Sequence, residues 1–380
     1  MNKKKLVFLL MVLCLMFTIS LTGCANNSYS HDYSGAGKFC GGLASVEKDE
    51  KYGFIDITGN LVVPCEWDFA ASFEEELALV RKGDEKSGKW GFIDKTGKPV
   101  IPCEYDSASS FNDGLARVEK DGKWGFIDKS GKAVIPCEYD NASWFDDGLA
   151  SVEKGRKWGF IDKTGKMVIP CQFEEVDEFR EELTAVKKNG KWGFIDKSGR
   201  TVIPFEYDMA YEFSEGLARV EKGEKSGFID KTGNVIIPLK YDWAGNFSEG
   251  MAGVEKEGKI GFIDTNGTVV IPFRYDGLDR GFRENLAAVY NGYFIYMKWG
   301  IIDKNGEEVI PLKYTFVRIL DKSLIAVVPS FDNWKWGVIN ENGKEVFPCE
   351  YDSVGYGEGY FTLIKDGYLS IFDKNRKKVF

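Results

Sequence analysis

A stretch of about 34 residues recurs along most of the chain, and it limits the folds that the chain can adopt. One copy, residues 123–140, reads KWGFIDKSGKAVIPCEYD. Similar copies follow one another at steps of 34 to 39 residues. The glycine after the aromatic residue marks the nine copies: Gly53, Gly91, Gly125, Gly159, Gly193, Gly227, Gly261, Gly300 and Gly337. Such spacing predicts an array of similar units that bury their apolar faces against one another.

Each copy has the pattern of a small antiparallel meander. Residues 115–120, 124–128 and 132–135 are rich in β-branched and aromatic types, which favour strands. Asp121-Gly122 is typical of a two-residue hairpin turn. We expect Pro136 to end the third strand, because proline has no N–H to donate. Residues 137–147 are either a fourth extended piece or an irregular loop.

The predicted fold is therefore all-β, with about nine meander repeats of roughly 34 residues. We favour an open β-solenoid or superhelix over a closed propeller-like ring. Propellers usually have about 4–8 blades, and nine copies with a degraded tenth at residues 368–380 exceed that range. The uneven repeat steps also fit an open array better.

The first 23 residues have the features of an export signal. Three lysines precede an apolar run over residues 6–19, and Leu21-Thr22-Gly23-Cys24 follows. These last four residues resemble the lipobox of bacterial lipoproteins, which implies that Cys24 is lipidated. An uncleaved anchor helix is the alternative, although the run is shorter than the roughly 20 residues of a membrane span.

Three regions result from this interpretation: a lipoprotein signal peptide at 1–23, a flexible tether at 24–37 and the repeat domain at 38–380. The expected location is extracytoplasmic, with lipidated Cys24 holding the chain to the bacterial cell membrane. Removing the three leader lysines changes the formal net charge from −9 to −12. Nucleic acid is therefore not an expected partner, because its phosphates require a basic surface.

The repeated pattern resembles the bacterial WG-repeat (KWG) family. The copies that begin at Trp90, Trp124, Trp158 and Trp192 match it best, whereas Ser226 and Ile260 replace the tryptophan in later copies. The resemblance covers nearly the whole mature chain. It implies a β-rich repeat domain, often on exported proteins and thought to mediate interactions, with no general catalytic motif.

Cysteines and carboxylates recur at fixed positions, which suggests structural roles. The position after the closing proline accepts Cys, Phe or Leu, so we expect it to be apolar and its thiols to be free rather than paired; the state of Cys40 stays open. An Asp such as Asp128 precedes the second turn of eight copies, and we expect it to cap that turn. Calcium at these turns is a minor alternative, and zinc is not expected, so no metal site and no cofactor are predicted.

We expect no enzymatic activity, because the repeats contain no histidine to activate a nucleophile. A non-repeated carboxylate pair with a raised pKa would favour a glycosidase instead. Aromatic residues outside the repeat register are the candidate binding residues, with coverage of the ends of the array as the alternative role. They are Trp144, Trp243, Tyr293, Phe294, Tyr296 and Trp334.

The sequence thus predicts a non-catalytic, lipid-anchored interaction module with an unknown envelope protein as partner. Binding of cell-wall or other extracellular polysaccharide through the candidate aromatic residues is the alternative.

Overall fold

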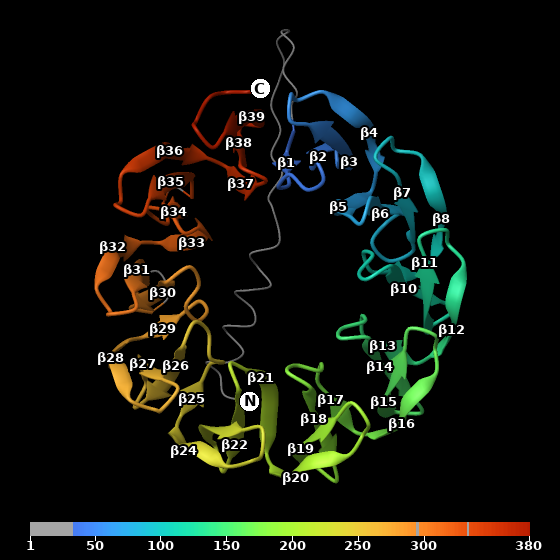
Figure 1. The fold of residues 1–380 in the computed structure, drawn as a ribbon. Coiled ribbons are helices and arrows are strands. Elements are labelled where there is room, and N and C mark those ends of the chain that lie inside the picture. Colours follow the sequence, from blue (N-terminus) through green and yellow to red (C-terminus); the bar gives the residue numbers. More distant parts are fainter. Residues whose placement is uncertain (1–32, 294–295, 333) are drawn as a thin grey trace. The chain divides into compact units, whose positions relative to one another are not determined.

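The computed structural model describes residues 33–293, 296–332 and 334–380, which belong to one compact unit, Asp32–Phe380. Within these ranges the chain forms ten small antiparallel sheets, nine with four strands and one with three. The sheets are the blades of a ring (Figure 1). The all-β repeat fold is confirmed, but the favoured open solenoid is wrong, and the structure has the closed propeller-like alternative.

Each blade is made from consecutive strands, so that blade 1 is β1–β4 and blade 10 is β37–β39. The first strand of each blade lies towards the centre of the ring (Figure 1). These first strands are β1 (Gly35–Ala36), β5 (Phe69–Glu74), β9 (Ser107–Ala108), β13 (Asn141–Ala142), β17 (Glu175–Val176), β21 (Met209–Ser214), β25 (Trp243–Ala244), β29 (Gly277–Leu278), β33 (Phe316–Asp321) and β37 (Ser353–Gly357).

The second strand carries the Leu-Ala-x-Val segment in most copies. It is β2 (Leu43–Lys48), β6 (Leu77–Lys82), β10 (Leu115–Lys120), β14 (Leu149–Lys154), β18 (Leu183–Lys188), β22 (Leu217–Lys222), β26 (Met251–Lys256), β30 (Leu286–Asn291), β34 (Leu324–Val328) and β38 (Tyr360–Lys365). The third strand carries the Trp-Gly pair in most copies. It is β3 (Lys51–Asp56), β7 (Lys89–Ile93), β11 (Lys123–Asp128), β15 (Lys157–Asp162), β19 (Lys191–Asp196), β23 (Lys225–Asp230), β27 (Lys259–Asp264), β31 (Lys298–Asp303), β35 (Trp336–Asn340) and β39 (Tyr368–Asp373).

The fourth strand lies on the outside of the ring (Figure 1). It is β4 (Leu61–Trp67), β8 (Pro99–Tyr105), β12 (Ala133–Tyr139), β16 (Met167–Phe173), β20 (Thr201–Tyr207), β24 (Val235–Tyr241), β28 (Val269–Tyr275), β32 (Glu308–Tyr314) and β36 (Glu345–Tyr351). The repeated proline lies inside this strand and does not end it, contrary to the sequence prediction. An edge strand tolerates proline because the missing N–H need not face a partner strand.

The strand and turn predictions for one copy otherwise hold. The first predicted strand has the bounds of β10, and Asp121 and Gly122 both have positive φ, as the predicted hairpin turn requires. The stretch after Pro136 completes β12 and then supplies β13 of the next blade. Tyr33 is buried and β1 starts at Gly35, so the last residues assigned to the tether belong to blade 1.

The core lies between neighbouring blades. Phe126 and Ile127 are adjacent on β11 and both are buried, so both faces of this blade are covered. Phe126 packs with Phe145 of blade 4 at 4.8 Å between ring centroids, while Ile127 packs in the cluster shared with blade 2. The apolar slot after the proline is also confirmed: in all nine copies its residue packs half-buried against such a cluster. These residues are Cys65, Cys103, Cys137, Cys171, Phe205, Leu239, Phe273, Leu312 and Cys349.

Polar links repeat from blade to blade on the loops between the first and second strands. Glu249 of blade 7 accepts hydrogen bonds from the Glu284 and Asn285 amides of blade 8, at 2.8 and 2.9 Å. Glu358 of blade 10 makes the same contact with the Gly41 and Gly42 amides of blade 1, at 2.8 and 3.1 Å. Buried residues of both terminal blades also form one apolar cluster. The ring therefore closes through a copy of the contact that joins interior blades.

Candidate binding pocket between blades 4 and 5

A pocket of about 310 Å³ lies where blades 4 and 5 meet. Its wall comes from β13, β17 and the loops that follow them, with Arg117 and Trp158 contributing from neighbouring strands. The side chain of Trp144 is 51% exposed, although tryptophan usually buries most of its surface. The remaining wall includes Ser143, Asp177 and Glu178. The pocket thus combines an aromatic face with several hydrogen-bonding groups.

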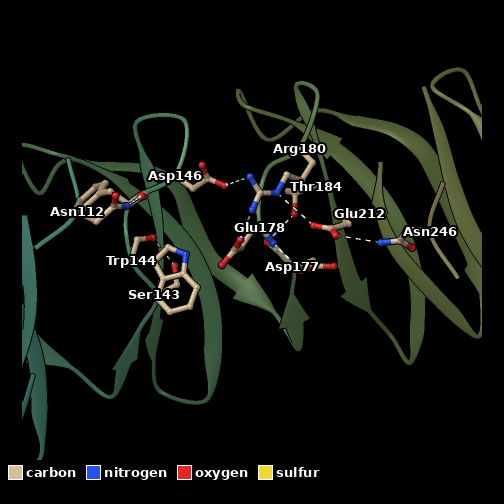
Figure 2. A network of polar contacts seen from close by, with 11 residues as sticks. Asn112, Ser143, Trp144, Asp146, Asp177, Glu178, Arg180, Thr184, Glu212 and Asn246 are labelled. Atoms are coloured by element: carbon tan, nitrogen blue, oxygen red, sulfur yellow. Dashed lines mark hydrogen bonds and ion pairs between the residues drawn. The ribbon is translucent and has the colours of Figure 1, made fainter. Parts of the chain in front are cut away.

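Arg180 connects three blades beside this pocket. Its guanidinium contacts Asp146 of blade 4 at 2.9 Å, Glu178 of its own blade at 3.1 Å and Glu212 of blade 6 at 3.3 Å. Figure 2 shows Arg180 between Asp146 and Glu212, with the indole of Trp144 nearby. Exposed ion pairs stabilise proteins weakly, but a shared guanidinium fixes the relative positions of several carboxylates.

Two carboxylates of the pocket have raised pKa values. Burial raises the pKa of Asp177, and the nearby charge of Glu212 raises it further. Burial also raises the pKa of Glu178, although Arg180 opposes this change. The Asp177 carboxylate accepts the Glu178 backbone amide at 2.9 Å. The chain therefore contains a non-repeated carboxylate pair with raised pKa values, the feature that the sequence analysis associates with a glycosidase.

Three charged residues of this site, Asp177, Glu178 and Arg180, occupy repeat positions where several other blades have neutral residues. Asp177, Ser143 and Asp279 occupy the same position of the repeat. In each case the backbone amide donates a hydrogen bond to the matching carbonyl of the second strand, which belongs to Ala185, Ser151 and Ala288, respectively. In most blades a phenylalanine lies in the loop between the first and second strands or near the end of the first strand, and it is called the loop phenylalanine below. Ser214 and Ser248 each follow this residue in their own blade, and their hydroxyls donate hydrogen bonds to the carbonyls of Phe247 and Phe282 in the next blade. Arg180 occupies this position in blade 5 and instead forms the ion pairs of Figure 2.

The structure places the candidate aromatic residues at separate locations. Trp144 lines the pocket. Trp243 is half-buried, with the Arg219 guanidinium 5.9 Å from its ring centroid. Tyr293 and Tyr296 are 60% and 76% exposed in the β30–β31 turn, and Trp334 is 40% exposed between β34 and β35. Phe294 and Cys24 lie outside the described residues.

Sequence reasoning missed Asp177, Glu178 and Arg180. Aligning the copies would have shown charged residues on both sides of Phe179, at positions where other copies have the neutral residues Ser110, Ser214 and Ser248. Such departures alone do not reveal a pocket, because the partners Asp146 and Glu212 come from other blades.

The described residues contain no group of three or more His, Cys, Asp or Glu side chains placed to hold a metal ion. The turn aspartates instead accept hydrogen bonds within their own turns: Asp128 accepts the Ser130 and Lys132 amides at 2.9 and 3.1 Å, which confirms their predicted capping role. The six described cysteines are free and half-buried. In these same ranges, no helix has the length and apolar character needed to cross a membrane.

The fold defines a class of circular all-β repeat proteins, and comparison with protein families gives the particular family. The model described as "WG containing repeat" matches residues 52–85, 90–124, 124–158, 158–192, 192–225, 227–259, 260–293, 299–328 and 336–368. The chain therefore belongs to the WG-repeat family, as its sequence resemblance indicated. No curated protein matches it.

Solved structures resemble this chain at low sequence identity. A crystal structure of the eukaryotic initiation factor is 13% identical, with a TM-score of 0.53 over 86% of this chain and 96% of that chain. This likeness shows the fold alone. Kluyveromyces lactis Hsv2p is 12% identical, with a TM-score of 0.35 over 61% of this chain and 92% of that chain. Porphyromonas gingivalis dipeptidyl peptidase 4 is also 12% identical, with a TM-score of 0.39 over 92% and 60%. The last two likenesses carry no argument about function.

Proposed function

We propose that this protein is a non-catalytic interaction module, held outside a bacterial cell membrane by lipidated Cys24. The observation that carries the proposal is the exposed indole of Trp144 beside the pocket between blades 4 and 5. Exposed aromatic residues next to polar groups are typical anchor points for a partner protein. Membership of the WG-repeat family supports the same reading.

The contacts made by the Asp177 and Glu178 carboxylates support the non-catalytic part of the proposal. Glu178 is ion-paired to Arg180, and Asp177 accepts a backbone amide. Both interactions oppose the rise in pKa that burial causes, and both tie the carboxylates to other groups of the protein. Release of reducing sugar from cell-wall glycan, abolished by Asp177→Asn and by Glu178→Gln, would contradict this part and identify a glycosidase.

A photo-crosslinking experiment tests the interaction. Benzoylphenylalanine replaces Trp144 in the full-length chain, which is expressed in its native envelope and irradiated. Ser110 is the control position, because it precedes the loop phenylalanine of blade 3 as Trp144 does in blade 4. We expect one discrete protein adduct at position 144, several-fold more abundant than at position 110. Equal adducts at both positions would contradict the proposal.

Binding of cell-wall or extracellular polysaccharide is the second candidate function. The exposure of Tyr293, Tyr296 and Trp334 favours it, because sugar rings stack on exposed aromatic rings. Sedimentation of residues 25–380 with purified peptidoglycan measures this binding. Loss of sedimentation in Tyr293→Ala/Tyr296→Ala would replace the protein-partner proposal with this one.

The membrane attachment has its own test. Cys24→Ser removes the thiol that would carry the lipid, so we expect the protein to leave the membrane fraction and to lose labelling by a palmitate analogue. Retention of the Cys24→Ser protein in the membrane fraction would favour an uncleaved anchor instead.

A further inference from the structure

The pocket between blades 4 and 5 has more negative than positive groups. Its carboxylates and those of the adjoining network are Asp146, Asp177, Glu178 and Glu212. Arg180 is the cation that three of them share. Arg117 also lines the pocket, but its guanidinium lies 4.3 Å from the Trp124 ring centroid and donates to the Ala142 carbonyl. With both arginines counted, two negative charges remain without a counter-charge.

Among the described residues, Asp177 is the one carboxylate of this group without a direct ion pair, although the charge of Arg180 acts on it from a distance. No ion pair to it is formed by the residues that the structure describes, whereas Glu178 beside it contacts Arg180. The side chain is half-buried on the pocket wall, where water solvates it poorly. A half-buried carboxylate gains from a charged donor, because a charge-assisted hydrogen bond is roughly twice as strong as a neutral one.

Trp144 provides a suitable second contact for the same cation. Elsewhere in the ring, cationic groups lie over aromatic faces: the Arg219 guanidinium is 3.4 Å from the Tyr211 ring centroid, and that of Arg318 is 5.1 Å from the Trp336 ring centroid. Within the described ranges no such cation lies over Trp144, whose indole is half exposed. Tryptophan is the aromatic side chain that attracts cations most strongly.

Building on the proposed function, we propose that this pocket binds a lysine or arginine side chain of the partner protein, with Asp177 as its counter-charge and Trp144 stacked against it. The cavity of about 310 Å³ has room for one such side chain. Ser143 and Ser151 on the wall offer further oxygen acceptors.

The test follows Trp144 directly. The protein is labelled with 5-fluorotryptophan, and the ¹⁹F resonance of Trp144 is assigned by its loss in Trp144→Phe. The probes are tetralysine, tetraarginine and the fully acetylated form of tetralysine, which has the same length without the side-chain charges. We expect the Trp144 resonance to shift with both cationic peptides and to remain unchanged with the acetylated one.

The matched variants are Asp177→Asn and Asp279→Asn. Asp279 occupies the same repeat position in blade 8, where it is exposed. We expect Asp177→Asn to weaken tetralysine binding by about tenfold or more, and Asp279→Asn to change it less than about twofold. Trp144→Leu, assayed through the remaining resonances and by calorimetry, gives a second measure should Asp177→Asn fail to fold.

Equal binding of acetylated tetralysine, or unchanged tetralysine binding in Asp177→Asn, would overturn the inference. A shift of Trp144 produced by neutral chitooligosaccharide but not by the cationic peptides would also overturn it and would favour a glycan site. These outcomes are separate from the crosslinking result, since a protein partner recovered at position 144 can bind without using a cationic side chain.

Discussion

In most blades an aspartate at the end of the third strand organises the turn that follows it. Asp230 is one example: its carboxylate accepts hydrogen bonds from the Thr232 and Asn234 backbone amides, both at 2.9 Å, and from the Asn234 side-chain amide at 2.9 Å. The hydrogen bonds from the side chains of Asn234 and Thr232 are the largest causes that lower the pKa of Asp230 to about 2. The ionised carboxylate is therefore the form that the folded turn stabilises.

Replacing Asp230 gives a prediction with a defined pH dependence. A carboxyl group whose folded pKa is lowered stabilises the protein above its unfolded pKa, and this contribution is lost as the pH falls from about 4 to about 2. Asp230→Ala should lower the free energy of unfolding by about 1 kcal/mol at pH 7, the value typical of a lost capping side chain. Urea titrations at pH 7 and pH 3 measure both effects.

Asp230→Asn is the control for this prediction. Asn340 occupies the same position in blade 9 and accepts the Asn342 and Lys344 amides at 3.0 and 2.8 Å, so asparagine satisfies the turn. We expect this variant to cost less than Asp230→Ala at pH 7 and to lose less stability than the parent protein between pH 4 and pH 2. An equal loss in both variants would mean that charge, rather than turn bonding, is the important property.

At the scale of the residue, the sequence predicted the role of a side chain wherever that residue recurs in the copies. The caps and the apolar slot were predictable because nine copies show which residue types each position accepts. Asp177 and Arg180 were not, because their roles depend on Asp146 and Glu212, which reach them from other blades. Trp243 is the opposite case: it lies outside the repeat register, and the structure packs it half-buried against the cluster between blades 7 and 8.

At the scale of the element, the glycine of each Trp-Gly pair permits the fourth strand to bulge. On β11 and β12, Trp124 pairs with Tyr139 and Phe126 with Ile135, so three residues of β12 face the single residue Gly125. A Cβ atom at Gly227, the equivalent glycine of β23, would lie 2.6 Å from the Ile237 carbonyl oxygen and 2.7 Å from the Leu239 nitrogen. Both contacts are with backbone and cannot relax by a rotamer change.

We therefore predict that Gly227→Ala lowers the free energy of unfolding by about 1 to 3 kcal/mol, the usual cost of overpacking. Gly281→Ala is the matched control, because a Cβ there would have Ser248 as its nearest neighbour at 3.4 Å, an ordinary contact. Thermal unfolding measured by circular dichroism compares the two variants. A similar loss in both would show that the bulge does not require glycine.

The strands and hairpins were largely predictable from local pattern, because the Asp-Gly turn and the β-branched segments act over short distances. The end of the third predicted strand was not. Proline is a reliable stop for a central strand, but here it lies in the outer edge strand, where its position depends on which strands cover which edge.

At the scale of the whole molecule, ring closure depends on one interface between residues far apart in the sequence. Glu358 contacts the Gly41 and Gly42 amides across the boundary between blades 10 and 1. The number and the uneven spacing of the repeats favoured an open array. The curvature of the ring, however, comes from the angle between neighbouring blades. That angle is a property of the packed interface and cannot be read from the pattern of a single copy.

Breaking this contact should loosen the two terminal blades. We predict that Glu358→Ala raises amide hydrogen exchange in both β2 and β38, with little change in blades 4 to 6. Glu249→Ala removes the equivalent contact between blades 7 and 8, where chain connectivity still holds the blades together, and should have a smaller effect. Exchange that is unchanged in β2 and β38 after Glu358→Ala would indicate that apolar packing alone closes the ring.

Every blade is made from one continuous stretch of chain, and within the described residues the closing contact of Glu358 copies the interior contact of Glu249. A gene that gains or loses one 34-residue unit by recombination would therefore still encode blades with compatible neighbours on both sides. The circumference of the ring would change, while the rules for joining its parts would not. The binding that we propose for the pocket between blades 4 and 5 would be one use of this redundancy, with two adjacent units forming the site while the remaining units maintain the scaffold.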